Sequence, residues 1–472
     1  MGKKSSSKIA IIAALTSMYP TFAAPQQGGA GASGGAPAGF QVDFGISTGL
    51  TFDDNFKLSV GGGGGTSTIW DTRLDFGISN VTQVDTLLLR GSGVLRFAEI
   101  PGRSLSGFES PDLRFSYMRD GINSRLSLDA RYRHVDREFL DPFKVEQEEQ
   151  QSGGLIGGGG TLTQRIAGLT WQTGLSGPLG FSATLKHDER DYAGIDPLLV
   201  GRLYDRETDS IQTTTSFRVS PVTSLFFNAG LTHYQAQDAA LTDRTTRDVS
   251  VGIQQDINPV LVLNGQIGFT EIETDTSLPV PATTTRDGIS SSFTLTQTLA
   301  NGSVWGNIGS SVSTNGTRTT LRFGRDYQLP LGTLSFALGA TRGQNGSTDA
   351  VGSVSYTRQL QTSDYSISLN RSATTNSASE DLLDTRLSLG YGYAIDNTSR
   401  LDVTLNYGLS ENQTTGIDIE RATLRASYSR ALTSDWNLVG GVQLRSYDET
   451  AVGDAWSNQL FVTLDRKFSF RP

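Results

Sequence analysis

Cysteine is absent from the 472-residue sequence, which excludes disulfide bonds, thiolate metal sites and lipid attachment through cysteine. After the N-terminus there is no apolar run of about eighteen residues, which excludes a membrane-spanning helix. Acidic residues outnumber basic ones, and the net charge of −9 argues against a general nucleic-acid binder. Proline is scarce, at 14 residues, whereas the 54 glycines suit a chain of many strands and turns.

Apolar residues make up only 36% of the chain, which is low for a large soluble core. A transmembrane β-barrel is compatible with this value, because its lipid-facing wall uses only every second residue. The stretch 458–470 shows such alternation clearly, and its polar residues fall mostly on the opposite parity, interrupted by Arg466. Successive strand side chains point to opposite faces, so this stretch is predicted to be a strand with one apolar face. Its apolar residues are Leu460, Val462, Leu464, Phe468 and Phe470.

A final strand that carries aromatic residues near its end resembles the closing strand of bacterial outer-membrane barrels, although Arg471 and Pro472 follow here. Similar alternation runs through 42–52, 70–78 and 401–409. In these stretches the positions that alternate with the apolar ones hold charged residues and glycine from one end of the chain to the other. A lipid-facing wall around a wet interior explains this more simply than a soluble sandwich does.

The connections between the alternating stretches give the second signal. Short turns alternate with long loops, which is typical of barrels with short periplasmic turns and long extracellular loops. The fold class is therefore predicted to be all-β: a single transmembrane antiparallel up-and-down β-barrel of about 22 strands, or about 20 if one hairpin is miscounted. The predicted long loops are 53–66, 98–111, 137–160, 191–208, 271–286, 371–380 and 411–417.

The segments before the barrel differ from it in composition. Residues 1–23 have the features of a signal peptide, because lysines precede the apolar segment 9–15 and small residues follow. Residues 24–39, which consist only of Gly, Ala, Gln, Pro and one Ser, are predicted to form a flexible periplasmic linker. Residues 40–472 would then form the barrel, located in the bacterial outer membrane with both termini periplasmic.

Charged residues of both signs fall on the inward parity. They are interpreted either as wall salt bridges or as a polar path for a hydrophilic solute. Arg125, Arg131 and Arg133 form a ladder suited to an anionic solute such as an acidic sugar. The same parity places Arg425 and Arg445 inward. The candidate lumen-lining residues are Asp71, Arg73, Asp75, Arg125, Asp129, Arg131 and Arg133.

The loop 137–160 is the candidate constriction. Asp141, Pro142 and a later Gly-Gly pair predict a short helix within it. Its acidic residues would narrow the pore if the loop folds inward, and the alternative is a solvated external loop. The candidate constriction residues are Glu146, Glu148 and Glu149.

Enzymatic chemistry finds little support. The three histidines, His134, His187 and His233, share the lipid-facing parity and are not expected to converge on one metal or nucleophile. The G-x-S-x-G spelling at 45–49 lies within a predicted strand, where a nucleophile elbow does not form. We therefore predict no catalytic residues, no metal site and no cofactor.

The segment 49–55, Gly-Leu-Thr-Phe-Asp-Asp-Asn, resembles the opening motif of the beta-barrel porins of type 2, Gram-negative proteins often linked to exopolysaccharide export. This resemblance implies an outer-membrane barrel and hints at polysaccharide. A TonB-linked receptor of similar strand number is disfavoured, since only 24–39 would be available as a plug.

The expected function is a porin-like outer-membrane pore for polar solutes, with saccharide or exopolysaccharide export as its specific form. The competing expectation is a non-conducting surface or scaffold protein that acts through its extracellular loops. The expected partners are outer-membrane lipid and lipopolysaccharide, the barrel-assembly machinery, and a polar solute or polysaccharide. No nucleic-acid partner is expected.

Overall fold

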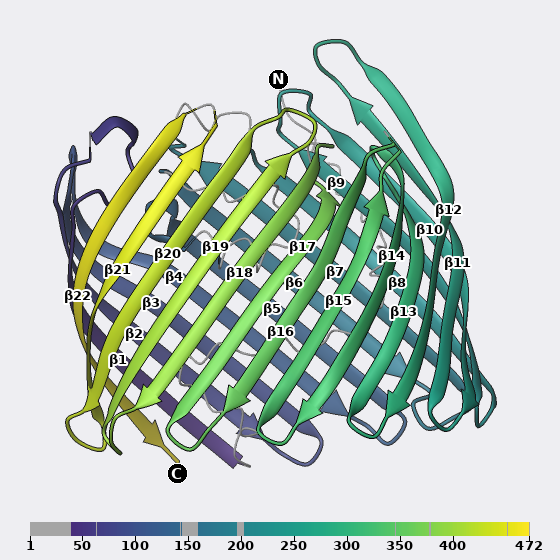
Figure 1. Ribbon diagram of the computed structural model, residues 1–472, viewed down its shortest axis with the longest axis horizontal. Coiled ribbons are helices and arrows are strands. Elements are labelled where there is room, and N and C mark those ends of the chain that lie inside the picture. The colour runs from purple at the N-terminus through teal and green to yellow at the C-terminus, as the bar shows by residue number, and fades with distance from the viewer. Residues whose placement is uncertain are drawn as a thin grey trace, which may run out of the picture.

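The computed structural model describes residues 39–62, 64–141, 143, 159–195, 203–344, 346–376, 379–450 and 452–471. These residues form 22 β-strands and two short 3-10 helices. Consecutive strands pair antiparallel, and β1 pairs with β22, which closes the sheet into a barrel (Figure 1). The prediction of an all-β barrel of about 22 strands is confirmed. In the described ranges, no helix is long and apolar enough to cross a membrane.

The strands are β1 (Gly39–Asp53), β2 (Ser67–Val81), β3 (Asp85–Ile100), β4 (Arg103–Asp120), β5 (Ser124–Asp136), β6 (Thr161–Thr173), β7 (Leu179–Ala193), β8 (Arg206–Ser220), β9 (Thr223–Ala236), β10 (Asp243–Asn258), β11 (Leu261–Thr276), β12 (Ala282–Leu299), β13 (Gly302–Ser313), β14 (Gly316–Leu329), β15 (Gly332–Arg342), β16 (Thr348–Gln359), β17 (Ser363–Thr375), β18 (Asp381–Ala394), β19 (Ser399–Asn412), β20 (Asp418–Ala431), β21 (Trp436–Glu449) and β22 (Gly453–Phe470). The 3-10 helices are η1 (Val60–Gly62) and η2 (Arg137–Phe139).

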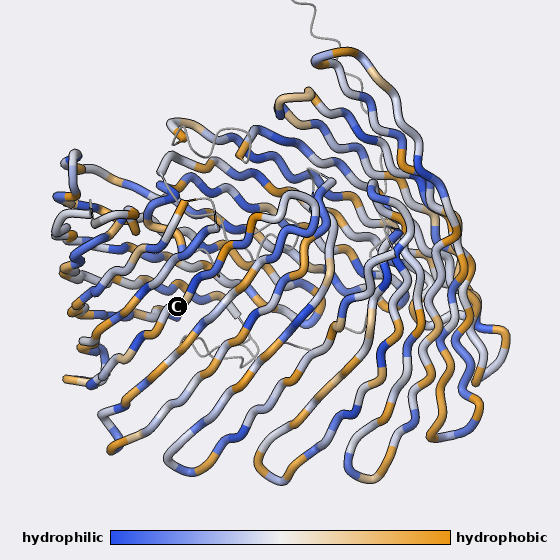
Figure 2. Tube along the Cα trace, turned by 45° about the horizontal axis from the view of Figure 1, so that its top comes forward, coloured by the Kyte–Doolittle hydropathy of each residue, from blue (hydrophilic) through white to orange (hydrophobic). Residues whose placement is uncertain are grey.

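Apolar side chains stand exposed on the outer face of the wall. Trp70 is 54% exposed and Leu338 is 68% exposed, and other large apolar side chains are exposed on strands throughout the barrel. Water-soluble monomers rarely expose a continuous apolar surface of this kind. Figure 2 shows hydrophobic and hydrophilic residues alternating along the strands. The period of two thus sorts one face towards membrane hydrocarbon and the other towards the lumen.

The two ends of the barrel differ. The terminal rim is the end where β1 begins and β22 ends, and its connections are short, as at 221–222 and 259–260. The opposite end, the loop rim, carries the longer connections, including 54–66 and 137–160. In Figure 1 the terminal rim lies at the bottom and the loop rim at the top.

Two expected loops are largely strand. The stretch 98–111 contains the end of β3, a tight turn at Pro101 and Gly102, and the start of β4. Pro111 is accommodated within β4 because a β-bulge interrupts the β3–β4 pairing beside it and Ser110 has a φ of 55°. The stretch 271–286 mostly belongs to β11 and β12, whose hairpin rises above the loop rim (Figure 1).

Candidate functional site at the mouth of the barrel

Asp53 fastens the loop 54–66 at the point where β1 reaches the loop rim. Its side chain is buried, and its carboxylate accepts hydrogen bonds from the backbone N–H of Asn55 at 2.9 Å and from the hydroxyl of Ser457 at 2.8 Å. Arg445 Nη2 donates a third, at 2.7 Å. Since Arg445 and Ser457 lie on β21 and β22, this buried carboxylate ties the first loop to the strands that close the barrel.

The next two residues of the motif complete the attachment. Asp54 accepts hydrogen bonds from the backbone N–H and the side-chain amide of Asn458, both at 2.7 Å. These bonds with Asn458 favour the charged carboxylate and hold the pKa of Asp54 below its ordinary value. The Asn55 amide donates to the carbonyls of Ser59 and Trp456. The Asp-Asp-Asn segment that suggested a porin family is therefore a clamp that shapes the mouth.

Beyond the clamp, the loop packs into the lumen. Phe56 stacks against Phe139 of η2, with ring centroids 4.9 Å apart, and the guanidinium of Arg96 lies 3.4 Å from the Phe139 ring centroid. Residues of two loops thus cover the inner wall of β2–β4 and narrow the mouth on this side. The buried cluster that they form is Phe56, Ile69, Ala98 and Ile100, with Leu105 and Phe139 packed against it.

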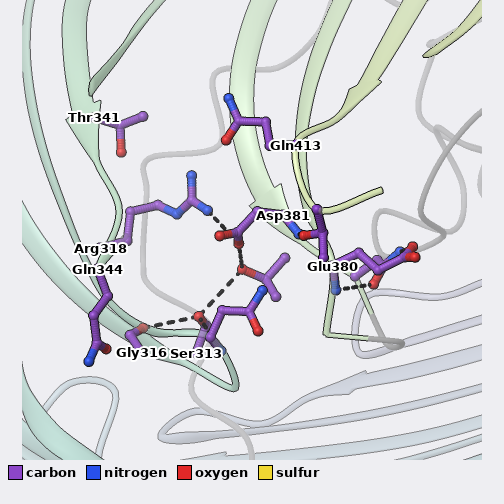
Figure 3. Close-up of polar contacts among 12 residues, drawn as sticks. Ser313, Gly316, Arg318, Thr341, Gln344, Glu380, Asp381 and Gln413 are labelled. Carbon is purple, nitrogen blue, oxygen red and sulfur yellow. Dashed lines mark hydrogen bonds and ion pairs between the residues drawn. The ribbon is translucent and has the colours of Figure 1, made fainter. Parts of the chain in front are cut away.

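A second group of contacts at the mouth holds the connection between β17 and β18 (Figure 3). Asp381 accepts from Arg318 Nη2 at 2.7 Å and from the Thr375 hydroxyl at 2.8 Å. The Arg244 guanidinium donates to the hydroxyl of Ser379 at 3.2 Å. Because Arg318 lies on β14 and Arg244 on β10, neither of which neighbours β18, these bonds hold the connection against distant parts of the inner wall.

At the mouth also lies an arginine patch, which we define as Arg421 and Arg425 on β20 with Arg445 on β21. The Arg425 guanidinium lies 3.9 Å from the ring centroid of Phe461, and that of Arg421 lies 4.4 Å from the centroid of Tyr447. Arg421 is 8% exposed. The patch therefore combines clustered positive charge with aromatic faces inside a confined mouth.

The seven predicted lumen-lining residues lie on the inner face of β2 and β5, opposite exposed apolar residues such as Trp70 and Tyr132. Most of them form ion pairs within the wall, as salt-bridge stiffening would require, and a solute path along them stays a prediction. Arg133 is buried, and Asp129 faces Gly168 across the sheet. These pairs are Asp71 with Arg96, Arg73 with Asp75, Arg125 with Asp120, and Arg131 with Asp112.

The candidate constriction residues Glu146, Glu148 and Glu149 lie outside the described residues, so their role stays a prediction. The described start of their loop does turn into the mouth, because η2 packs on Phe56. Asp141 also acts electrostatically on Arg425 and Arg445.

The sequence reasoning placed Arg425 and Arg445 inward but missed Arg421. The signal was available, since Arg421 shares its parity with Arg425. What the sequence lacked was the register that brings β20 beside β21, where Arg421 faces Tyr447 and Arg425 faces Gln443.

No protein-family profile matches the chain, and no curated protein matches it. Solved structures do. The chain is similar to the FrpB iron transporter from Neisseria meningitidis, with a TM-score of 0.57, 9% identity and coverage of 90% of this chain and 82% of that one. For the ferric-catecholate import receptor Fiu from E. coli K12 the TM-score is 0.56, the identity 11% and the coverage 90% and 81%. For the siderophore receptor PirA from Pseudomonas aeruginosa the TM-score is 0.53, the identity is 11%, and the match covers 92% of this chain and 81% of that one.

These likenesses show the fold of an outer-membrane β-barrel, and they correct two expectations. The similar structures are receptors and transporters for iron and siderophores, and the porin type 2 resemblance is not supported. The expected pore for saccharide or exopolysaccharide export, and its alternative of a non-conducting scaffold, are contradicted for the same reason. The expectation that 24–39 is too short to form a plug is not tested by a likeness in fold, and it stays a prediction.

Proposed function

We propose that the protein is a receptor-type transporter that binds an anionic iron chelate at its mouth and admits it to the lumen. The observation that carries this proposal is the arginine patch, set in a barrel whose solved likenesses bind or import iron compounds. The loop rim would face the exterior and both termini the periplasm. Lipid, lipopolysaccharide and the barrel-assembly machinery would be its other partners.

The chemistry of the patch suits a ferric catecholate. Such a chelate combines net negative charge with aromatic rings, and guanidinium groups both donate charge-assisted hydrogen bonds and stack on ring faces. Phe461 and Tyr447 already hold the faces of Arg425 and Arg421, so the side chains are oriented before a ligand arrives. These side chains therefore lose less conformational entropy when a ligand binds.

The inward loops supply the gate. The clamp at Asp53 and the bonds of Asp381 hold two different loops at the mouth. A ligand that bound the arginine patch would compete with these contacts and shift the loops towards an open arrangement. A wide barrel would otherwise leak, so a ligand-dependent opening reconciles its size with selective uptake.

Binding to the purified barrel tests this proposal. We expect a ferric tris-catecholate to quench tryptophan fluorescence saturably, and an uncharged ferric hydroxamate to bind much more weakly. Replacing Arg421 and Arg425 together with glutamine should weaken catecholate binding by more than about ten-fold, since each charge-assisted hydrogen bond contributes about 1.5–3 kcal/mol.

Arg466→Gln is the matched control, because Arg466 stacks on Trp436 and Phe468 at the terminal rim, away from the mouth. Equal binding of charged and uncharged chelates, or unchanged catecholate binding by the double variant, would contradict the proposal. Retained heat-modifiable gel mobility would show that each variant is folded.

A further inference from the structure

The outer face near the loop rim carries pairs of carboxylates that share an arginine. On β6 and β7, Arg165 Nη1 lies 2.8 Å from Glu189 and 2.7 Å from Asp191. On β10 and β11, Arg247 Nη1 bridges two more glutamates, at 2.7 and 3.0 Å. In both clusters one guanidinium balances two negative charges beside the membrane boundary.

A third carboxylate pair, on β8 between those two clusters, has a different partner. His187 Nδ1 lies 2.8 Å from Asp209 Oδ1 and 3.7 Å from Glu207 Oε1. Within the described ranges, His187 is the partner of every ion pair that Glu207 and Asp209 make. In this cluster a histidine, which can ligate a metal ion, stands where the two neighbouring clusters have an arginine, which cannot.

The register of the sheet fixes these three side chains together. His187 and Asp209 are direct cross-strand partners on β7 and β8, and Glu207 lies two residues from Asp209 on the same face. Their ligand atoms all lie within 4.8 Å of one another. Side chains of paired strands converge in this way without any loop, so little reorganisation is needed to bring them onto one ion.

The geometry points to a divalent metal site formed by His187, Glu207 and Asp209 on the outer wall of the barrel. One imidazole nitrogen and two carboxylates form a donor set for Zn²⁺ or a similar borderline ion. For bonds of about 2.1 Å, tetrahedral ligand atoms lie about 3.4 Å apart, close to the 2.8 and 3.7 Å observed.

The ion would replace the hydrogen bond that now joins His187 Nδ1 to Asp209. Binding needs the imidazole to be unprotonated, so protons compete with the metal. The side chains of Glu207 and His187 are 46% and 37% exposed, and water would fill the open coordination positions. Leu185, on the same face of β7, is exposed towards the membrane, so the bound ion would join β7 to β8 at the membrane boundary.

Titration of the tag-free barrel in detergent with Zn²⁺ tests the site. We expect one saturable Zn²⁺ per barrel at neutral pH, binding that weakens in acid because protons compete with the metal for the ligands, and a Co²⁺ absorption band typical of nitrogen and oxygen ligands. His187→Asn should weaken Zn²⁺ binding by about ten-fold or more, and Glu207→Gln with Asp209→Asn should abolish it.

His134→Asn is the matched control, because His134 also faces outward but contacts the hydroxyl of Thr163 at 2.8 Å instead of carboxylates. Its Zn²⁺ binding should equal that of the unmodified protein. No saturable Zn²⁺ binding by the unmodified barrel, or unchanged binding by a folded His187→Asn variant, would overturn the proposal.

Discussion

Replacing Asp53 with asparagine tests how the mouth is built. The change keeps the size of the side chain but removes the charge that faces Arg445 Nη2 at 2.7 Å. The Arg445 side chain is 17% exposed and that of Asp53 is 0% exposed. A guanidinium would therefore be left inside the wall without its carboxylate.

The magnitude follows from that burial. Removing one partner of a buried ion pair typically costs about 3–5 kcal/mol, because the remaining charge stays desolvated. Arg445 keeps bonds to the Ser457 hydroxyl and the Phe56 carbonyl, and asparagine can still accept one hydrogen bond. We therefore expect a loss near the lower end, about 3 kcal/mol.

Urea unfolding of the barrel refolded in detergent, followed by tryptophan fluorescence, measures this loss. Asp54→Asn is the control, since Asp54 lies at the surface and its bonds come from the neutral Asn458. Adding Arg445→Gln to Asp53→Asn should recover part of the stability. Unfolding of Asp53→Asn within about 0.5 kcal/mol of the unmodified protein would refute this view of the clamp.

Three further outcomes are expected. Phe56→Ala should cost about 3 kcal/mol in the same unfolding assay, because it removes a ring from the buried loop cluster; a loss below about 1 kcal/mol would show that the loop is not packed. Asp381→Asn should raise ion leakage in planar bilayers, because Arg318 no longer holds the β17–β18 connection, and unchanged leakage would remove this connection from the gate. In the turn between β18 and β19, the Thr398 hydroxyl and N–H donate hydrogen bonds to the Asp396 carboxylate and lower its pKa below the ordinary 3.8. The stability that these bonds give the turn is therefore present above pH 3.8 and is lost as the pH falls through the lowered pKa. The protection of the amides in this turn, measured as the intrinsic exchange rate divided by the observed rate at the same pH, should therefore fall in acid, and Asp396→Asn should remove that fall.

The sequence predicted the wall well because period-two alternation is imposed by the membrane itself. The stretch 458–470 lies within the closing strand β22, as its parity indicated. Prediction failed where strands rise beyond the hydrocarbon, since both faces of such a strand are polar. For this reason 271–286, rich in Thr, was assigned to a loop although β11 and β12 run through it.

The sites depend on contacts that no local pattern contains. The parity of His187 correctly placed it outward, but its convergence with Glu207 and Asp209 follows from the pairing of β7 with β8. The clamp joins Asp53 to Ser457 across nearly the whole sequence. The porin expectation failed because Asp53, Asp54 and Asn55 were interpreted as a family signature, whereas their contacts are structural.

Uptake of a radiolabelled ferric catecholate by Gram-negative cells that lack other catecholate receptors tests the proposed transport most directly. Cells that make the unmodified protein should accumulate iron, and cells that make a correctly assembled Arg421→Gln, Arg425→Gln variant should not. Equal background accumulation in both, with the protein present in the outer membrane, would contradict a role in iron-chelate uptake.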